Sequence, residues 1–409
     1  MQKIRILFIH SQLGLGGAET ELLDILRHID RERFEPMLCY FRPSVGDSSI
    51  LNDVVKVGLP MYLVDRVNLS VPKFMWQLIG VIRQTRPDVI NTWGVRGNPV
   101  GQLAALLAGQ RRVVSLDFHN GLAGGWRARL AEMLLCRLDA GRIAVSYAVA
   151  DTYASVLHMD RRRINVVRSG IDTDRFIPLP PDEALRAELG IPQDWRIVTM
   201  VARLTVYKNH RMLIRAAERV CQRLPKTVFL VVGTMHEYDY GVKDAQGQPV
   251  PNIEVLRQMV AEAGIEQNVK FLGPRRDVPE ILSITDVFTM TSETEALNNA
   301  VLEAMAAERP VVATAVGGMK ELILPGQTGY YADHDDDAVL AERLVELLED
   351  EPKRLAFGKA ARRAILEEFT LPIMIQRKSD IYARAAQSRF SWLRLLTRGY
   401  AHRRAQQNP

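Results

Sequence analysis

Two glutamates, Glu295 and Glu303, stand eight positions apart at the beginning of a predicted helix. A carboxylate accepts hydrogen bonds from two hydroxyl groups at once, which suits the diols of a sugar or a ribose. A helix N-terminus offers free backbone N–H groups and a partial positive charge, which suit a phosphate. The pair could therefore bind different parts of one ligand. On spacing alone, two solvated surface charges are the more frequent explanation.

Two cations, Arg203 and Lys208, follow another predicted strand. Positive charges at the mouth of a sheet can neutralise the charge that develops on a departing nucleoside diphosphate, without a metal ion. Taken in isolation, the pattern also fits two ordinary surface cations.

The first half of the chain has two further candidate features. Gly16 and Gly17 directly follow the first predicted strand, where glycine lets the backbone approach a ligand closely. The segment GLGGAE fails as a dinucleotide-binding fingerprint, because Glu19 stands where a small residue is required. A plain tight turn is the alternative. His119 ends a later strand, but a lone histidine is usually structural or solvated.

The sequence gives no indication of a metal site. Asp333, Asp335 and Asp337 imitate a metal-binding DxD motif, but they precede an amphipathic segment, so we interpret them as helix caps. The cysteines, at 39, 136 and 221, are too far apart to suggest zinc or a disulfide framework, which fits a reducing cytoplasm.

Short apolar runs alternate along the chain with longer amphipathic segments, which predicts βα units and parallel sheets. These elements would position the residues described above. The first half contains predicted strands at 4–9, 37–41, 61–64, 88–93, 113–118, 142–146 and 165–167, and the second at 197–202, 228–232, 269–272, 287–291, 311–315 and 329–332. A proline-rich linker, RFIPLPPDEALRAELGIP, separates the two series. We therefore expect two doubly wound domains with the ligand in the cleft between them.

The helix that carries Glu303 is predicted from an apolar face of Leu297, Ala300, Val301, Ala304 and Met305. Asn299 and Glu303 would share another face. A last helix is expected from about 372 to 386. The tail after it, SRFSWLRLLTRGYAHRR, is either a frayed solvated end or an interfacial helix on anionic lipid.

Composition narrows the class of protein. The 409 residues are 47% hydrophobic and 25% charged, as in ordinary globular proteins, and 409 residues favour two domains. No apolar run reaches the roughly 18 residues of a membrane span, and MQKIRILFIH lacks the features of a signal peptide. The net charge of +5 includes arginines at 127, 129, 137, 142 and 161–163, yet aromatic residues are only 7% and no nucleic-acid-binding motif accompanies them. Nucleic acid is therefore a disfavoured partner.

The E-x7-E pattern, followed by AMA and RPVVATAVGG, resembles family 4 of the retaining glycosyltransferases of GT-B type. Other segments resemble that family in the expected order: GLGGAE (14–19), FHNG (118–121), SGIDTDRF (169–176), VARLTVYKNH (201–210), FLGPRRDVPEIL (271–282) and EEFTLPIMIQRKSDIY (367–382). The resemblance covers the chain from Phe8 to about Tyr382.

The resemblance implies an α/β GT-B fold of two facing Rossmann-like domains with a C-terminal crossover helix. Residues 1–175 would form the acceptor-side domain, 176–370 the nucleotide-sugar domain, and 371–409 the crossover helix and basic tail. It implies catalytic roles for His119, Arg203, Lys208 and Glu295. Donor-binding positions would be Gly16, Gly17, Gly233, Arg275, Leu297, Asn298, Asn299, Ala300 and Glu303. His119 would contact the transferred sugar, Glu295 would orient it, and Glu303 would bind the ribose.

The implied reaction moves a hexosyl group, with retention, from a nucleotide sugar to a glycan or lipid-linked acceptor, without cofactor or metal. A UDP-sugar is favoured over GDP-mannose, and cell-surface polysaccharide synthesis is the expected setting. The expected location is the cytoplasm, with the inner face of the cell membrane as a peripheral site. The alternatives are a nucleotide-sugar epimerase, a phosphorylase, and a non-catalytic binding protein on the same fold.

Two residues depart from the family pattern. Ala296 stands where glycine usually follows the first glutamate, and Asn298 where proline or glycine is frequent. A methyl group at 296 would crowd some donors, so these departures leave the identity of the sugar open.

Overall fold

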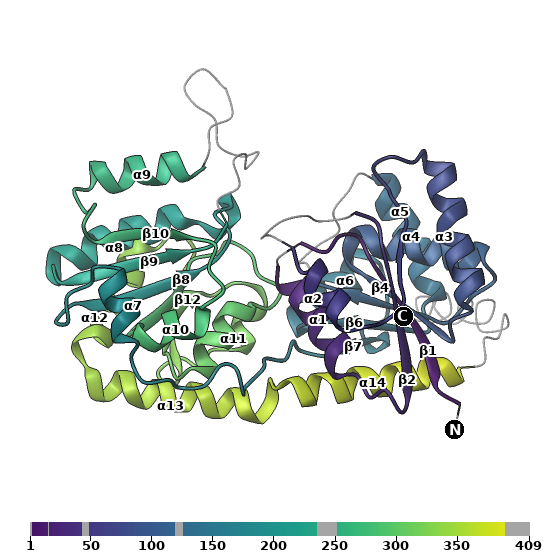
Figure 1. Ribbon diagram of the computed structural model, residues 1–409. Helices are drawn as coiled ribbons and strands as arrows, with labels where there is room; N and C mark the ends of the chain where they lie inside the picture. The colour runs from purple at the N-terminus through teal and green to yellow at the C-terminus, as the bar shows by residue number, and fades with distance from the viewer. Residues whose placement is uncertain (1, 15, 43–48, 119–125, 235–251, 389–409) are drawn as a thin grey trace, which may run out of the picture.

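A computed structural model describes residues 2–14, 16–42, 49–118, 126–234 and 252–388. They form two domains, each a parallel sheet with helices on both faces (Figure 1). The predicted doubly wound α/β architecture is therefore confirmed. Within the described residues, no helix combines the length and the apolar character needed to cross a membrane.

The described part of the N-terminal domain contains a sheet of seven strands in the order β3-β2-β1-β4-β5-β6-β7. Its strands are β1 (Ile4–His10), β2 (Phe34–Tyr40), β3 (Met61–Leu63), β4 (Val89–Trp93), β5 (Val113–Asp117), β6 (Gly141–Ala144) and β7 (Ile164–Val166). Its helices are α1 (Gly17–His28), α2 (Leu51–Lys56), α3 (Val71–Thr85), α4 (Gly94–Leu107), α5 (Trp126–Leu135) and α6 (Tyr147–Val156). Strand order changes direction beside β1 and β4, which is where open α/β sheets bind ligands.

The described part of the C-terminal domain contains six strands in the order β10-β9-β8-β11-β12-β13. Its strands are β8 (Arg196–Val201), β9 (Thr227–Val232), β10 (Val269–Gly273), β11 (Val287–Met290), β12 (Val311–Thr314) and β13 (Gly329–Ala332). Its helices are α7 (Glu183–Glu188), α8 (His210–Arg223), α9 (Asn252–Glu262), α10 (Val278–Ile284), α11 (Asn299–Ala306), α12 (Asp337–Glu349) and α13 (Glu351–Glu368).

Every predicted strand is present, with boundaries shifted by a few residues. The largest shift is in β2, which begins at Phe34 because residues 34–36 pair with the start of β1. The predicted linker is partly wrong. Its second half contains α7, which is capped by Asp182 and buries Leu185 against the C-terminal domain. Tertiary burial therefore gives a helix to a segment that its prolines marked as unstructured.

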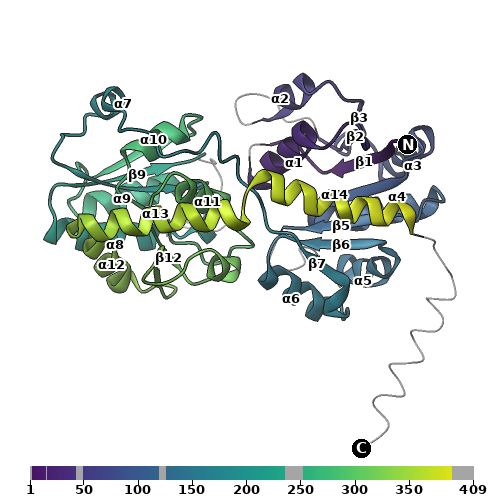
Figure 2. The ribbon, with the colours of Figure 1, turned by 90° about the horizontal axis from the view of Figure 1, so that it is seen from below.

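The last helix, α14 (Leu371–Gln387), returns from the C-terminal domain and lies along the N-terminal domain (Figure 2). Met374, Ile381 and Tyr382 are part of the N-terminal core. Lys378 of α14 forms a fully buried ion pair with Glu21 of α1. The C-terminal helix is thus an integral part of the first domain.

The two chain segments that connect the domains lie side by side. The Ile171 amide donates to the Phe369 carbonyl (2.8 Å), and the Leu371 amide donates back to the Ile171 carbonyl (3.1 Å). A Cβ atom at Gly170 would lie 2.5 Å from the Thr370 carbonyl oxygen, so the close approach requires glycine. The SGID segment therefore joins both connections into one junction.

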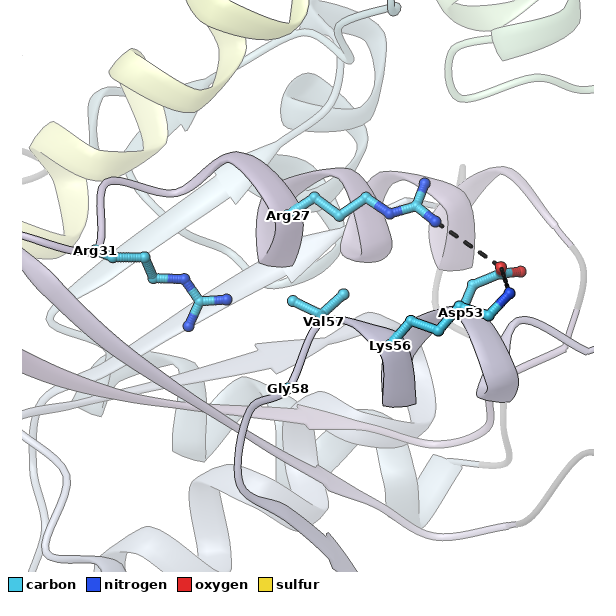
Figure 3. Close-up of a pocket in the computed structure, with 6 residues that line it drawn as sticks. All are labelled: Arg27, Arg31, Asp53, Lys56, Val57 and Gly58. Carbon is cyan, nitrogen blue, oxygen red and sulfur yellow. Dashed lines mark ion pairs between the residues drawn. The ribbon is translucent and has the colours of Figure 1, made fainter.

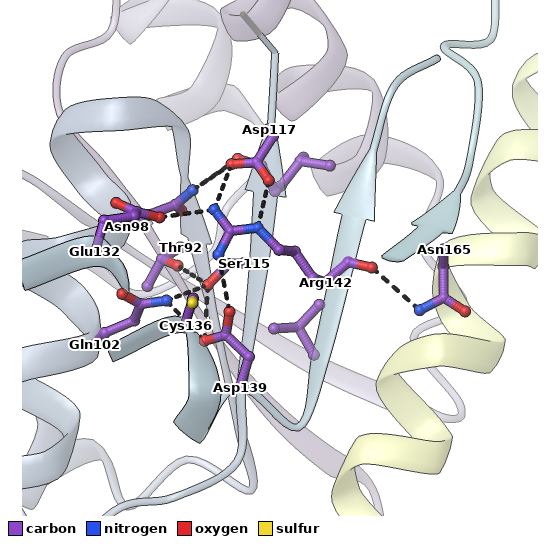
Figure 4. Close-up of polar contacts among 12 residues, drawn as sticks. Thr92, Asn98, Gln102, Ser115, Asp117, Glu132, Cys136, Asp139, Arg142 and Asn165 are labelled. Atoms are coloured by element: carbon purple, nitrogen blue, oxygen red, sulfur yellow. Dashed lines mark hydrogen bonds and ion pairs between the residues drawn. The ribbon is translucent and has the colours of Figure 1, made fainter. Parts of the chain in front are cut away.

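One of the clustered arginines, Arg142, lies in the core of the N-terminal domain (Figure 4). Arg142 is 1% exposed and pairs with Asp117 (2.6 Å), Glu132 (2.7 Å) and Asp139 (3.2 Å). Burial raises the pKa of Asp139 to about 7, although the Arg142 charge acts in the opposite direction. The network joins β5, β6 and α5 beneath the end of β5, from which the chain continues to His119.

Candidate functional site

The predicted site residues of the C-terminal domain come from loops at the carboxyl ends of neighbouring strands. Arg203 and Lys208 follow β8, Gly233 follows β9, and residues 291–298 follow β11. Because β9, β8 and β11 are adjacent in the sheet, these loops converge at one edge. That edge is the usual ligand-binding position in parallel sheets.

Glu295 is the centre of a polar cluster. One of its carboxylate oxygens, Oε1, accepts hydrogen bonds from Lys208 Nζ (2.5 Å), Ser292 Oγ (2.6 Å) and Asn298 Nδ2 (2.8 Å). Glu295 is only 8% exposed, so the Lys208 charge and two neutral donors compensate the loss of water. The carboxylate is therefore held in a fixed position at the sheet edge.

The backbone around Glu295 is also fixed. Thr314 Oγ1 donates to the Ser292 carbonyl (2.5 Å), and the Gly318 amide donates to the Glu295 carbonyl (3.1 Å). A Cβ at Gly318 would lie 2.0 Å from the Ala296 carbonyl oxygen. The AVGG segment after β12 therefore packs against and supports the loop of residues 291–298, and this close contact explains the glycine at position 318. Ser292 was not predicted, although a hydroxyl three residues before Glu295 was visible in the sequence.

Helix α11 begins later than its apolar spacing predicts. Asn298 is the N-cap, and its side-chain oxygen accepts from the Val301 amide (3.1 Å). Leu297 therefore lies in the loop before the helix, not on its buried face, and packs against the cores of both domains. Asn298 thus has two functions, because its oxygen caps the helix while its nitrogen donates to Glu295.

The glycine loop of the N-terminal domain meets the start of α11. The Asn299 side chain donates from Nδ2 to the Gly17 carbonyl (3.2 Å), and a Cβ at Gly17 would lie 3.3 Å from the same nitrogen. A Cβ at Gly16 would lie 2.6 Å from a carboxylate oxygen of Glu19. Gly17 therefore lies in a close contact between the domains, and Gly16 in a close contact within the start of α1.

Arg203 lies near this boundary as well. Its guanidinium donates to the Tyr207 hydroxyl (2.8 Å). Burial raises the pKa of Glu19, at the start of α1, and the positive charge of Arg203 opposes that rise. Gly233 has a φ of 153°, and a Cβ there would lie 1.9 Å from the Ala202 carbonyl oxygen, so only glycine fits beside the Arg203 backbone.

The structure does not bring every predicted residue into this cluster. Arg275 forms a separate group with Asp277 (2.5 Å) and Glu188 (3.3 Å). Ala300 and Glu303 lie in α11 and are half-buried. His119 lies outside the described residues.

Aromatic residues at the strand ends of the N-terminal domain were not predicted. The rings of Trp93 and Phe118 stack at 5.0 Å, and His10 packs against Trp93 at 5.6 Å. Burial lowers the His10 pKa to about 4, so the ring is neutral near pH 7. The ammonium of Lys378 lies 5.4 Å from the Trp93 ring centre. The three rings of His10, Trp93 and Phe118 thus form an aromatic cluster at the ends of β1, β4 and β5, and the Lys378 ammonium lies against it.

The aspartates that imitate a DxD motif are mainly ion-pair partners. Asp337 pairs with Arg215 (2.9 Å) and Arg219 (2.7 Å), and Asp335 accepts from Asn209 (3.0 Å). The cap of α12 is Asp336, so the prediction that Asp333, Asp335 and Asp337 are the caps was wrong about the capping residue. Across the described ranges, no group of three or more His, Cys, Asp or Glu side chains is arranged to hold a metal ion.

A cavity of about 510 Å³ lies between α1 and α2 (Figure 3). It is lined by Arg27, Arg31, Asp53, Lys56, Val57 and Gly58. Asp53 partly neutralises the cations, at 3.9 Å from Arg27 and 3.8 Å from Lys56. None of the predicted site residues lines this cavity.

Comparisons with known proteins match both domains. A family model described as "Glycosyltransferase Family 4" matches residues 15–175, and one described as "Glycosyl transferases group 1" matches 181–364. An alpha-maltose-1-phosphate synthase from Mycolicibacterium smegmatis is 33% identical over 309 residues, which cover 70% of this chain and 76% of that protein. The chain belongs to family 4 of the glycosyltransferases.

Other relatives differ in how much of their length is matched. A D-inositol 3-phosphate glycosyltransferase from Corynebacterium aurimucosum is 30% identical over 63% of this chain and 60% of its own length. Two further enzymes of that name are matched over 49% and 46% of their length, so the chain spans about half of these relatives. A UDP-Gal:alpha-D-GlcNAc-diphosphoundecaprenol alpha-1,3-galactosyltransferase from Escherichia coli is 22% identical over 93% of this chain and 97% of its own length.

Solved structures agree with the fold. A glycosyltransferase from Rickettsia africae has a TM-score of 0.81 at 18% identity, and covers 95% of this chain and 100% of its own. Anabaena HepE in complex with UDP and glucose has a TM-score of 0.80 at 22% identity, and covers 93% of this chain and 99% of its own. The predicted GT-B fold is confirmed.

Proposed function

We propose that this family 4 member transfers a hexosyl group, with retention, from a nucleotide sugar to a glycan or lipid-linked acceptor. The observation that carries the proposal is the Lys208–Glu295 ion pair at the sheet edge. Arg203 lies in the same loop after β8 as Lys208, and Asn299, four residues after Glu295, contacts Gly17 of the other domain. This combination suits a sugar diphosphate, because the oriented carboxylate accepts from sugar hydroxyls and the cations pair with the phosphates.

The proposed roles follow from the chemistry of each group. Arg203 and Lys208 neutralise the diphosphate as it leaves, which is electrostatic stabilisation of the transition state. Glu295 accepts hydrogen bonds from the sugar hydroxyls, and Glu303 from the ribose diol. The acceptor hydroxyl attacks the anomeric carbon on the face from which the diphosphate departs, and the departing diphosphate oxygen takes its proton. The new glycosidic bond then keeps the anomeric configuration of the donor.

The names of relatives support a UDP-sugar as donor, with GDP-mannose as the second choice. The Escherichia coli relative is named as a UDP-Gal enzyme, and Anabaena HepE was solved with UDP and glucose. A Mycolicibacterium smegmatis relative is named as GDP-mannose-dependent. The Escherichia coli name also specifies a diphosphoundecaprenol-linked substrate, which supports a lipid-linked acceptor and polysaccharide or lipopolysaccharide synthesis at the inner membrane face.

The first test is a panel of UDP- and GDP-sugars scored by thermal shift, because a ligand that binds the native state raises its apparent stability. The donor that binds is then incubated with and without acceptor extracts, and the product anomer is determined by NMR. Retention in a new glycoside supports the proposal. A changed sugar on the nucleotide without acceptor would indicate an epimerase, and an inverted product would contradict the mechanism.

Donor affinity should depend on pH through Glu303. Burial raises the pKa of this carboxyl to about 7, and Asp24 adds to the rise while Arg175 opposes it. Only the carboxylate accepts both ribose hydroxyls, so affinity is lost as pH falls through about 7. Between pH 8 and pH 6 we expect the Kd for UDP to rise about tenfold, measured by calorimetry.

Two variants control this result. Glu303→Gln should bind more weakly at pH 8 and show a flatter profile. Glu308→Gln, just beyond the end of α11, should keep the wild-type profile. A Glu303→Gln profile as steep as that of the wild type would show that the pH dependence has another source.

The basic tail should contribute to membrane binding. Deleting residues 387–409 removes Trp392, Leu395 and Leu396 together with several arginines. Because cations and apolar side chains both favour an anionic interface, the truncated protein should bind anionic vesicles less in a sedimentation assay, while donor hydrolysis persists. Equal vesicle binding by both proteins would exclude an interfacial role for the tail.

A further inference from the structure

The outer surface of three helices in the N-terminal domain exposes large apolar side chains. These are Val71 and Trp76 of α3, Leu103, Leu106 and Leu107 of α4, and Leu130 and Leu134 of α5, here called the outer helical face. Trp76 is 76% exposed, Leu134 59% and Leu107 52%. Helix α4 contacts both α3 and α5, so the three form one layer, on the side turned away from the C-terminal domain (Figures 1 and 2).

Helices α4 and α5 have an inverted polarity. In α4, Ala104 and Ala105 are fully buried, while the three leucines, at i, i+3 and i+4, form an exposed stripe. In α5, the charged Glu132 is 2% exposed and pairs with Arg142, while Leu130 and Leu134 point outward. A helix at a water-facing surface normally places its leucines inward and its charges outward. The inversion indicates that this face contacts an apolar surface other than the core of its own domain.

The charges around the outer helical face have one sign. Lys73 and Arg83 of α3 and Arg137, just after α5, are exposed. Within the described parts of 66–138, the carboxylates face inward or are bonded: Asp117 and Glu132 pair with Arg142, and Asp88 accepts from the Arg5 amide. The face therefore combines apolar side chains with uncompensated cations.

We propose that the outer helical face docks on an anionic lipid surface, with the leucines of α4 and α5 and Trp76 entering the interface. Charge complementarity favours lipid over a second copy of the chain, because a two-fold self-contact would bring Lys73, Arg83 and Arg137 together with their own copies. The end of α14 lies near α4, since the Ser388 carbonyl accepts from Arg112, just after α4.

The inference extends the proposed function by placing the membrane against the N-terminal domain, which is the proposed acceptor-side domain. Helix α4 begins directly after β4, at the carboxyl end of the sheet. The exposed leucines lie in its last turns, at the other end of the helix, so a membrane on this face would adjoin the N-terminal domain without covering the strand ends. Docking itself needs only the exposed face and would stand without the transferase activity.

The test uses the full chain and vesicles of phosphatidylcholine with or without phosphatidylglycerol. The variant Leu106→Gln/Leu107→Gln/Leu134→Gln removes apolar side chains that are exposed, so its fold should be kept. Its matched control is Leu324→Gln/Leu355→Gln, since these leucines are equally exposed (51% and 54%) but lie in the C-terminal domain. We expect the triple variant to bind anionic vesicles about tenfold less, and the control to bind as the wild type does.

A second variant, Lys73→Glu/Arg83→Glu/Arg137→Glu, should lose the preference for phosphatidylglycerol. Equal vesicle binding by the wild type and the triple variant would overturn the proposal. The proposal would also be overturned if light scattering showed that the wild type is a dimer and the triple variant a monomer, while both bind vesicles equally. Donor hydrolysis in detergent-free buffer separates the two proposals. If the wild type hydrolyses no donor but the triple variant still binds vesicles less than the wild type, the proposed function fails and the docking surface stands.

Discussion

Replacing Glu295 with glutamine should lower kcat/KM by about 10²- to 10³-fold, which corresponds to about 2.7–4 kcal/mol of lost transition-state stabilisation. The carboxylate is held by Lys208, Ser292 and Asn298 on a single oxygen. The amide variant keeps the size of the side chain but removes the charge that Lys208 pairs with. The measurement is initial rate against donor concentration with the donor found in the thermal-shift panel.

Lys208→Ala should have an effect of similar size, and the double variant should lose little more than either single variant, because the two side chains act as a unit. Glu293→Gln is the matched control: Glu293 lies in the same loop, but it is 43% exposed and faces His334 at 3.8 Å. Near-wild-type rates in both Glu295→Gln and Lys208→Ala would refute the site assignment. A loss in Glu293→Gln as large as in Glu295→Gln would show only that the loop tolerates no change.

Replacing Arg142 with methionine should destabilise the N-terminal domain by about 3–5 kcal/mol, because it leaves buried carboxylates without their cation. Arg142 pairs with Asp117, Glu132 and Asp139, and all four side chains are almost inaccessible to water. The unfolding midpoint in a thermal melt should fall by roughly 10 °C. Arg137→Met, an exposed arginine five residues earlier, should change stability by less than about 0.5 kcal/mol.

The destabilisation should depend on pH with a defined sign. Burial raises the pKa of Asp139 to about 7, above its unfolded value, so the native state binds more protons than the unfolded state between about pH 4 and pH 7. Stability from this group is therefore present at low pH and is lost as pH rises toward 7. Without Arg142, only protonation can remove the charge of these buried carboxyls. The loss of unfolding free energy in Arg142→Met should therefore be smaller at pH 5 than at pH 8. A cost independent of pH would show that lost packing, not charge, causes the effect.

Much of the fold could be predicted from local pattern. Short β-branched runs have a period and length that few other structures share, so each predicted strand is present. The boundaries were less certain because they depend on partners. β2 begins at Phe34 only because β1 pairs with it, and α7 forms inside a proline-rich segment because Leu185 is buried by a neighbouring helix. The start of α11 was misplaced since Asn298 caps it and leaves Leu297 in the loop.

The sequence by itself determined the fold class, the family, and the identity of Arg203, Lys208, Glu295 and Glu303 as candidate ligand-binding residues, because residue type and order carry that information. Only the tertiary structure decided which of them meet. It joined Lys208 to Glu295, which are 87 positions apart, and placed Asn299 against Gly17 of the other domain. It also placed Arg275 in a separate ion pair with Asp277. It also placed Arg142, one of several arginines clustered in the sequence, in the core and left leucines on the outside. Contacts between segments distant in the chain depend on strand order and domain packing, which no local pattern of residues records.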